Sequence, residues 1–229
     1  MMISSLLKSR DWTINDQPEY FPGICDNPQD YVTWSDVEWC LNNPQFYDIK
    51  FINRNTNNFI EYPKYPRFWS EDHADPVDMM NIFAEGHTCI IEKFEWIDRK
   101  RQDILKELEE YFPKIVGSFH IYAGIGECKS FKVHEDYANN FILQVEGETH
   151  WKVYNNRCSN LLAYNLNVNE DDLDCAIDVI MKPGDVLYIP VRHYHWAQPS
   201  EKRLSCSIPM QHLLPYKKTV DRKYYALPH

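Results

Sequence analysis

The stretch that decides the fold is FKVHEDYANNFILQVEGETHW, residues 131–151. It opens on His134, Glu135 and Asp136 and then becomes an apolar strand at residues 139–147. A strand that only filled a hydrophobic core would not open on a histidine and two acids. Because residues i and i+2 of a strand face the same side, we expect His134 and Asp136 to point into one space and Glu135 to point away. These two side chains are two thirds of a facial metal site, which a second histidine would complete.

The second histidine should come from a distant strand that folds beside the first. The candidate segment is KPGDVLYIPVRHYHW, residues 182–196. Its P-G-D triplet predicts a tight turn before a buried strand. His193 and His195 follow, and their spacing of two residues puts both on one face of a strand. We expect one of them to be the ligand and the other to form a wall of the site or to support it.

Short strands dominate the second half of the chain, and turn signals recur between them at close spacing. We expect them at residues 118–124, 131–136, 139–147, 149–155, 177–184, 185–191 and 203–210. The first half mixes helices and strands around a long loop. We expect helices at residues 33–43, 76–86 and 98–113, strands at 46–53 and 87–96, and the loop at 54–76. This pattern predicts an antiparallel sandwich or barrel that follows an α/β region.

The composition is that of a globular protein, because 44% of the 229 residues are hydrophobic. No apolar run is long enough to cross a membrane, and residues 1–12 show no signal-peptide pattern, so we expect a cytoplasmic protein without a membrane partner. Seven cysteines without a C-x-x-C pair predict reduced thiols. The net charge of -10 disfavours nucleic-acid binding, which needs Lys and Arg to neutralise phosphates. It suits a basic peptide or a small substrate.

The two segments together resemble the JmjC-type cupin oxygenases, in the branch that includes bacterial and eukaryotic ribosomal oxygenases. One family pattern, G-F-x-x-H-x-D-x-x-x-x-F-x-x-Q-x-x-G-x-K-x-W, is matched here by Phe131, His134, Asp136, Phe141, Gln144, Gly147 and Trp151. The other pattern, P-G-D-x-L-Y-I-P-x-x-x-x-H, is matched within residues 183–195. The resemblance implies that His134, Asp136 and His195 hold Fe(II). It also implies a double-stranded β-helix, the jelly roll of the cupins.

The resemblance covers most of the chain. We therefore expect one JmjC-like cupin domain over residues 1–229, mainly β with an α/β region at its N-terminus. The α/β region spans residues 1–115, the jelly-roll core spans residues 116–212, and residues 213–229 form a C-terminal tail. We expect a monomer or a weak dimer.

The resemblance also implies the chemistry. Two histidines and one carboxylate leave coordination positions on one side of the iron open. In the family, 2-oxoglutarate fills two of these positions and dioxygen a third. Oxidative decarboxylation of 2-oxoglutarate to succinate then supplies the oxidising power to hydroxylate an unactivated C–H bond. We expect an Fe(II)- and 2-oxoglutarate-dependent hydroxylase whose catalytic residues are the three metal ligands.

The sequence departs from the family at the residue that usually pairs with the distal carboxylate of 2-oxoglutarate. The family has a lysine two positions after the glycine of its pattern, and this chain has Thr149. A buried carboxylate without a cation is costly, so another residue should supply the charge, or the cosubstrate differs. Arg203 is the first candidate, because residues 203–205 resemble the R-x-S pair of other 2-oxoglutarate oxygenases, and Lys132 is the second. The remaining expected contacts are the hydroxyls of Tyr122, Thr149 and Ser205 and the amide of Asn140.

Two other interpretations stay open. One is a metal-dependent cupin enzyme that does not use 2-oxoglutarate, and the other is a non-catalytic binding module. For the hydroxylase, we expect a peptide or protein side chain as the substrate, with a free amino acid or another small metabolite as the alternative. The aromatic loop between Phe59 and Pro76 is expected to wall a groove for an extended chain. His120 is expected to line the pocket. The other histidines expected to be packing or surface residues are His73, His87, His150, His212 and His229.

Overall fold

The structure is a computed structural model of the chain, and it describes residues 3–8, 12, 16–67, 70–111, 115–126, 130–158, 168–199 and 201–212. The helices in these residues are α1 (Ile3–Leu7), α2 (Trp34–Asn42), α3 (Pro76–Ala84) and α4 (Arg99–Glu109), with short 3-10 turns η1 (Pro28–Asp30), η2 (Pro44–Phe46), η3 (Phe94–Ile97) and η4 (Glu170–Asp172). The strands are β1 (Glu19–Phe21), β2 (Asp48–Ile52), β3 (Tyr65–Arg67), β4 (Ser70–His73), β5 (Thr88–Glu92), β6 (Ile115–Gly117), β7 (His120–Gly124), β8 (Asn139–Glu146), β9 (Thr149–Arg157), β10 (Cys175–Met181), β11 (Val186–Ile189), β12 (His193–Pro199) and β13 (Arg203–His212).

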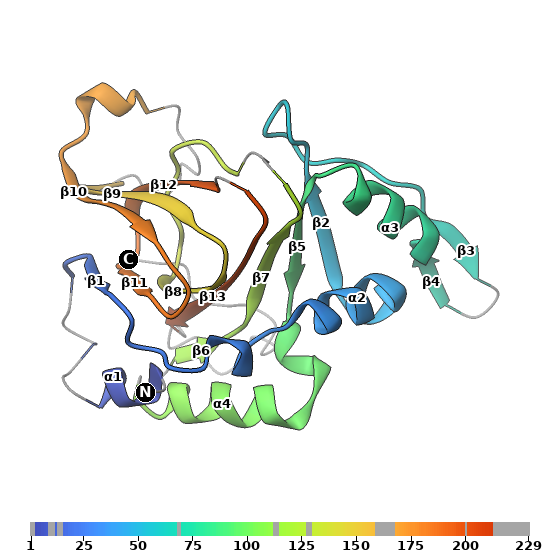
Figure 1. The fold of residues 1–229 in the computed structure, drawn as a ribbon, viewed down its shortest axis with the longest axis horizontal. Helices are drawn as coiled ribbons and strands as arrows, with labels where there is room; N and C mark the ends of the chain where they lie inside the picture. The colour runs from blue at the N-terminus through green and yellow to red at the C-terminus, as the bar shows by residue number, and fades with distance from the viewer. Residues whose placement is uncertain are drawn as a thin grey trace, which may run out of the picture.

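The strands form a jelly roll with one large and one small sheet (Figure 1). The large sheet has eight strands in the order β1-β11-β8-β13-β7-β5-β2, and β6 pairs with β13 at its side. The small sheet has the order β10-β9-β12, and a separate hairpin joins β3 to β4. The strand pairs within the large sheet and within the small sheet are antiparallel, which confirms the predicted fold class.

The N-terminal region supplies strands at both edges of the large sheet. At one edge β1 pairs with β11, and at the other β5 pairs with β7 and is followed by β2. The turn between β10 and β11 anchors the first of these edges. Asp185 accepts hydrogen bonds from the hydroxyl of Tyr20 at 2.6 Å and from the backbone N–H groups of Gly23 and Lys182, both at 2.7 Å. The P-G-D triplet therefore ties the start of the chain to the jelly roll.

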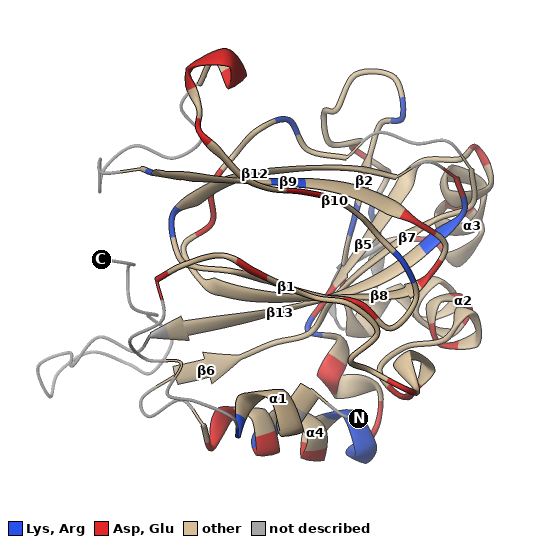
Figure 2. Ribbon diagram, turned by 60° about the vertical axis from the view of Figure 1, so that its left-hand side comes forward, with Lys and Arg blue, Asp and Glu red and all other residues tan. Residues whose placement is uncertain are grey.

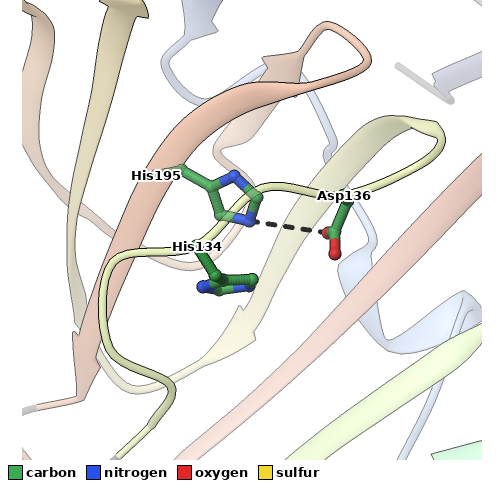
Figure 3. Close-up of side chains that lie close together, drawn as sticks. All are labelled: His134, Asp136 and His195. Atoms are coloured by element: carbon green, nitrogen blue, oxygen red, sulfur yellow. Dashed lines mark ion pairs between the residues drawn. The ribbon is translucent and has the colours of Figure 1, made fainter. Parts of the chain in front are cut away.

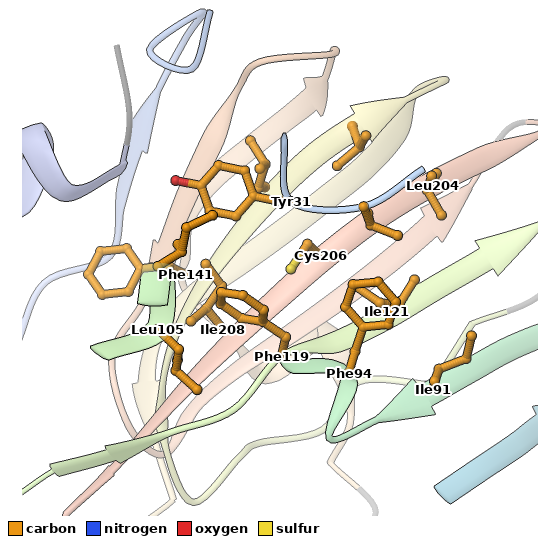
Figure 4. Close-up of a cluster of buried hydrophobic side chains, with 14 of the residues drawn as sticks. Tyr31, Ile91, Phe94, Leu105, Phe119, Ile121, Phe141, Leu204, Cys206 and Ile208 are labelled. Atoms are coloured by element: carbon orange, nitrogen blue, oxygen red, sulfur yellow. The ribbon is translucent and has the colours of Figure 1, made fainter. Parts of the chain in front are cut away.

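One face of the large sheet packs against the helices and makes the main hydrophobic core (Figure 4). Along β13, Leu204, Cys206 and Ile208 belong to this core, whereas Ser205 and Ser207 lie between them and point to the opposite face. Strand geometry forces this alternation. The other strands contribute Phe141, Leu143 and Val145 from β8, Ile121 and Ala123 from β7, Cys89 and Ile91 from β5, and Ile49 and Phe51 from β2.

Each helix buries one apolar side against this core. In α4, Ile104, Leu105 and Leu108 are buried at the spacing of one helix face. Asp98 caps the helix by accepting a hydrogen bond from the backbone N–H of Arg101 at 2.8 Å. At the start of α2, Thr33 and the third helical residue form a reciprocal capping box. No helix in the described ranges is both long and apolar enough to span a membrane.

A second, smaller core fills the space between the two sheets. It consists of Ile142, Trp151, Val153, Met181, Leu187, Ile189 and Ala197. These residues come from β8 and β11 of the large sheet and from all three strands of the small one. The interior of the jelly roll is therefore apolar and packed at the end formed by these side chains.

The secondary structure differs from the sequence prediction in three places. The loop predicted at residues 54–76 contains the β3–β4 hairpin. The strand predicted at 87–96 ends at Glu92, because Lys93 adopts a left-handed conformation with φ of 59° and the chain turns into η3. The strand predicted at 131–136 is absent, and this segment joins a sheet only through one bridge at His134. The predicted tail, residues 213–229, lies outside the described residues.

Gly147, between β8 and β9, is a position where only glycine fits. Its φ is +72°, and a Cβ added there would lie 2.0 Å from the carbonyl oxygen of Lys202. We expect Gly147→Ala to lower the free energy of unfolding by about 2–4 kcal/mol, because the backbone must adopt a strained conformation and also move. Urea denaturation measures the change. Gly126→Ala is the control, since a Cβ there meets nothing within 4 Å, and an equally large loss in both variants would contradict the explanation.

Candidate metal centre

The side chains of His134, Asp136 and His195 lie close together (Figure 3). The first two come from the segment before β8, and His195 comes from β12. Their ligand atoms all lie within 4.8 Å of one another. Nε2 of His195 is 3.5 Å from Oδ2 of Asp136, and the two imidazole rings are 4.3 Å apart between centroids. Three ligands at this spacing could hold one metal ion.

Backbone hydrogen bonds hold the two histidines side by side. The N–H of His134 donates to the carbonyl of His195 at 3.1 Å, and the N–H of His195 donates to the carbonyl of His134 at 2.8 Å. This reciprocal pair is an isolated antiparallel bridge. Two residues paired in this way have their Cα atoms about 5.5 Å apart, so ligands distant in sequence are brought within reach of one ion.

Hydrogen bonds to the outer ring nitrogens orient both imidazoles. Nδ1 of His134 donates to the carbonyl of Lys132 at 2.7 Å, and Nδ1 of His195 donates to the carbonyl of His193 at 2.9 Å. Carbonyl oxygens only accept, so each Nδ1 carries the proton and each Nε2 is the ligand nitrogen. This is the arrangement that metal-binding histidines use to fix their tautomer and ring orientation.

Glu135 points away from the metal site, as predicted, into a buried ion pair. Its carboxylate lies 3.3 Å from Nη1 of Arg192, and the two side chains are 0% and 1% exposed. The N–H of Arg192 donates to the carbonyl of Asp136 at 2.9 Å, and its guanidinium lies 4.6 Å from the ring centroid of Tyr137. Arg192 has a φ of 67° in the turn between β11 and β12. This turn therefore holds Glu135, Asp136 and Tyr137 in one position.

Burial and neighbouring charges set the protonation of the three ligands. Burial, assisted by the charge of His195, lowers the pKa of His134 to about 4. Burial alone would raise the pKa of Asp136, but its hydrogen bond to His195 and the charge of that ring outweigh burial and hold the pKa well below its usual range. Burial alone would lower the pKa of His195, and Asp136 raises it by more. A metal ion would thus compete with a proton mainly at His195.

The structure decides between the two histidines of β12. Nδ1 of His193 donates to the carbonyl of Tyr154 at 2.8 Å, and its ring is buried outside the group of three ligands. The pairing of β12 with β9 is irregular between His193 and His195. His193 supports the site through its backbone carbonyl, which the spacing of the sequence does not reveal.

Asn140 holds the carboxylate ligand from the side. Its Nδ2 donates to Oδ2 of Asp136 at 2.8 Å, and its Oδ1 accepts a hydrogen bond from the hydroxyl of Ser207 at 3.4 Å. The predicted contact of Asn140 with a cosubstrate stays a prediction, and in this structure Asn140 binds a candidate metal ligand and also lines the large cavity. Ser207 is a further residue of the site that the sequence reasoning missed, although the alternating pattern of β13 places it on the inner face.

Two cavities adjoin the three ligands. The larger has a volume of about 590 Å³ and extends along the inner face of the large sheet to β2. The smaller, of about 30 Å³, is lined by all three ligands. The cavities share five lining residues, which are Tyr122, Phe131, His134, Asp136 and Ser207. A small molecule could therefore place one end in the small cavity and still reach the metal centre.

The candidate cosubstrate residues occupy different parts of these cavities. Arg203 and Ser205 line the small cavity, and the guanidinium of Arg203 lies 5.7 Å from the ring centroid of Tyr122. The hydroxyl of Ser205 donates to Oε1 of Gln144 at 3.0 Å. Lys132 lines the large cavity beside His134. Thr149 is fully buried on the inward side of β9 and is not among the described residues that line either cavity.

The residues of the family pattern have separate structural tasks. Gln144 donates to the carbonyls of Glu146 and Gly147 at 2.9 and 3.2 Å and so shapes the turn after β8. The ring of Trp151 stacks on His195 with a centroid distance of 6.1 Å and an interplanar angle of 28°. Phe141 belongs to the main hydrophobic core, between the large sheet and the helices. Within the pattern, Trp151 therefore supports a metal ligand, whereas Gln144 and Phe141 stabilise the fold.

Sequence reasoning missed much of the large cavity. His120 lines it, as predicted, but so do Lys50, Glu92, Asn57, Asn58 and Gln211. Of the predicted aromatic wall between Phe59 and Pro76, Phe59 lines the cavity, whereas the described residues 60–66 do not. Asn57 donates to the carbonyl of Ser130, and Phe59 packs against Phe131 with ring centroids 5.8 Å apart. These contacts hold only the start of the loop against the site.

The fold and the three ligands define a jelly-roll protein with a two-histidine, one-carboxylate centre. The model of the JmjC domain family matches residues 90–216, more than half of the chain, and the protein belongs to this family. The match covers every ligand and both segments that carry the sequence resemblance. The family assignment made from the motifs is therefore confirmed.

Curated relatives resemble parts of the chain. Ribosomal oxygenase 1 of Danio rerio is 32% identical over 96 residues, which are 40% of this chain and 18% of that protein. The bifunctional lysine-specific demethylase and histidyl-hydroxylase NO66 of Aedes aegypti is 27% identical over 201 residues, which are 79% of this chain and 30% of that protein. The chain therefore spans less than a third of the length of these two relatives.

Solved structures with the same fold include YcfD, a ribosomal oxygenase from Escherichia coli, in complex with cobalt and 2-oxoglutarate. It superposes with a TM-score of 0.62 at 13% sequence identity, over 94% of this chain and 53% of that one. The complex of the same protein with cobalt and succinic acid gives a TM-score of 0.60 at 16% identity. At these identities the similarity supports the jelly-roll fold.

If the three residues are the metal ligands, His195→Ala should weaken Mn(II) binding by more than about 100-fold, since loss of an outer partner alone costs about 10- to 100-fold. Mn(II) serves as a redox-stable substitute for Fe(II), and calorimetry measures its affinity. His193→Ala is the matched control, because its carbonyl remains in place to orient His195. Normal binding by His195→Ala together with lost binding by His193→Ala would show that the wrong histidine was chosen.

Proposed function

We propose that this protein is an Fe(II)- and 2-oxoglutarate-dependent oxygenase that hydroxylates an unactivated C–H bond of a peptide or protein side chain. The observation that carries the proposal is the convergence of His134, Asp136 and His195 at the junction of two cavities. Membership of the JmjC domain family supports it. The names of the relatives, ribosomal oxygenase and histidyl-hydroxylase, favour a polypeptide substrate over a free metabolite.

The small cavity suits the distal carboxylate of 2-oxoglutarate. Arg203 provides a cation there, and a guanidinium is the group best shaped for a carboxylate. Within the described residues, Thr149 Oγ1 and Trp151 Nε1 are buried without a hydrogen-bond partner. Both belong to the inward side of β9, on which Trp151 reaches the small cavity. The residues present therefore fit a carboxylate, and we assign its charge partner to Arg203 in place of the usual lysine.

Bound iron with 2-oxoglutarate and dioxygen would supply the oxidising power for hydroxylation. The protein contributes position and a dry environment. Asn140 fixes the orientation of Asp136, and the clamp between Glu135 and Arg192 fixes the segment that carries two ligands. Trp151 and Phe131 cover the two histidine rings, with Phe131 5.2 Å from His134 between centroids. Apolar walls of this kind exclude water, which protects a reactive centre from side reactions.

The function is tested by supplying Fe(II), 2-oxoglutarate, dioxygen and a broad pool of peptides. We expect succinate to form and one peptide residue to gain one oxygen atom, as measured by mass spectrometry. His134→Ala is the control and should produce neither. Stimulation by a free amino acid without modification of any peptide would change the substrate to a small metabolite. If metal binds and 2-oxoglutarate is not consumed, the protein is a cupin of another activity.

The assignment of Arg203 has its own test. Arg203→Met keeps most of the buried volume and removes the charge, so it should raise the KM for 2-oxoglutarate by about one to two orders of magnitude, as expected for a charged hydrogen bond of about 1.5–3 kcal/mol. Steady-state kinetics with varied 2-oxoglutarate measure the change. The exposed Arg157 provides the control Arg157→Ala, and Thr149→Ala should have a much smaller effect than Arg203→Met. An unchanged KM in Arg203→Met would transfer the role to Lys132.

A further inference from the structure

A polar row crosses the inner face of the large sheet from the metal centre to the outermost strand. Ser207 of β13 lies opposite His120 of β7. The antiparallel register of β5 and β7, continued by one residue, puts Glu92 opposite His120. Asp48 of β2 in turn lies opposite Glu92. Residues directly opposite in antiparallel strands share a face of the sheet, so this row is continuous with the ligand support at Asn140.

The outer end of the row carries two carboxylates and one ammonium group. Asp48 and Glu92 are directly opposite each other, and like charges in that position destabilise a sheet. Nζ of Lys50 lies 2.7 Å from Oε1 of Glu92 and 3.7 Å from Oδ2 of Asp48. One positive charge therefore serves two negative charges, which leaves the group with a net charge of -1. His120 adds no charge at neutral pH, because burial lowers its pKa.

Two of these three charged side chains line the cavity of the metal centre, and Asp48 lies beside them, outside the described lining. Lys50 and Glu92 line the cavity of about 590 Å³ together with His134 and Asp136. Their side chains are 38% and 25% exposed, so a bound molecule could reach them. Three strand spacings separate β8 from β5, which is roughly 14 Å. That distance corresponds to about four residues of an extended chain.

We propose that Glu92 and Asp48 form a distal subsite for a basic side chain of the polypeptide substrate, a lysine or an arginine about two to four residues from the one that is hydroxylated. The subsite rests on the proposed hydroxylation of a polypeptide. It adds a means of selecting the substrate, which is recognition of a basic residue near the hydroxylated one. A cation suits the place because it relieves the repulsion between two opposed carboxylates that share one ammonium.

The charges around the subsite argue against an acidic side chain as the guest. Lys50 is already paired with Glu92 at 2.7 Å, so a guest carboxylate would bring a third negative charge to one ammonium. The whole chain also has 34 acidic against 24 basic residues, and Figure 2 shows acidic positions distributed over helices, loops and strands. Such a field attracts a basic peptide to the surface and repels an acidic one.

The test uses degenerate peptide pools in which Lys, Glu or Ala is fixed in turn at each position flanking a central variable residue. The protein is supplied with Fe(II), 2-oxoglutarate and dioxygen, and mass spectrometry measures the rate of oxygen addition to each pool. We expect Lys pools to react faster than Ala pools at one flanking position and Glu pools to react most slowly. Glu92→Gln should reduce the preference for Lys about three- to tenfold, as expected for a partly exposed ion pair. Asp48→Asn should reduce it less.

Two controls separate charge recognition from damage to the fold. Glu38→Gln changes an exposed acid on α2 outside the cavity and should keep the wild-type preference. Asp48→Asn changes a side chain that is 45% exposed, so it should fold normally even if Glu92→Gln does not. Peptide hydroxylation without a charge preference, or with one that survives both Glu92→Gln and Asp48→Asn, would overturn the subsite and leave the proposed function intact. Failure of every pool to be hydroxylated would overturn both.

Discussion

The alternation of side chains along the strands of the large sheet is the constraint on which the rest of the structure depends. Along β13, Leu204, Cys206 and Ile208 pack against the helix-covered core, so the residues between them must face the interior of the jelly roll. A slip of one residue would bury Ser205 and Ser207 among apolar groups and turn the core residues toward the cavity. The hydrophobic packing of one face therefore fixes the position of every polar group on the other. The metal support, the cation of the small cavity and the distal charged group all lie on that second face.

The metal centre itself is assembled where regular sheet pairing ends. His134 meets His195 through a single reciprocal bridge, and the neighbouring residues are held by side-chain contacts in place of a ladder. Glu135 and Arg192 are the main such contact. An uncompensated buried charge costs several kcal/mol, so neither member can leave its position alone. The segment of residues 134–136 is thereby held in one position, as a metal site needs, although it is not part of a strand.

The position of the cation distinguishes this chain within its family. The residue on β9 where the family pattern has a lysine is Thr149, and its buried hydroxyl belongs to the inward side of the strand. The nearest buried cation of the small cavity is on β13, at Arg203. Because the two strands belong to different sheets, the proposed partner Arg203 would approach a bound carboxylate from the opposite wall. An ion pair there would be strong in a dry interior.

The sequence by itself indicated the fold class and the family, and it named the three candidate ligands that the structure brings together. Strand alternation and turn residues are local signals that can be read from a sequence. The same holds for the spacing of His134 and Asp136 and for the P-G-D segment before His195. The sequence also predicted that Glu135 points away and that Arg203 is a candidate cation. Only the tertiary structure showed the role of His193, whose ring lies outside the group of three ligands and whose backbone carbonyl accepts the hydrogen bond from Nδ1 of His195. Tertiary structure likewise paired Glu135 with Arg192 and brought Lys50, Glu92 and His120 to the cavity of the metal centre. These contacts join segments that are distant in the chain, and strand order, which no local pattern encodes, decides which of them become neighbours.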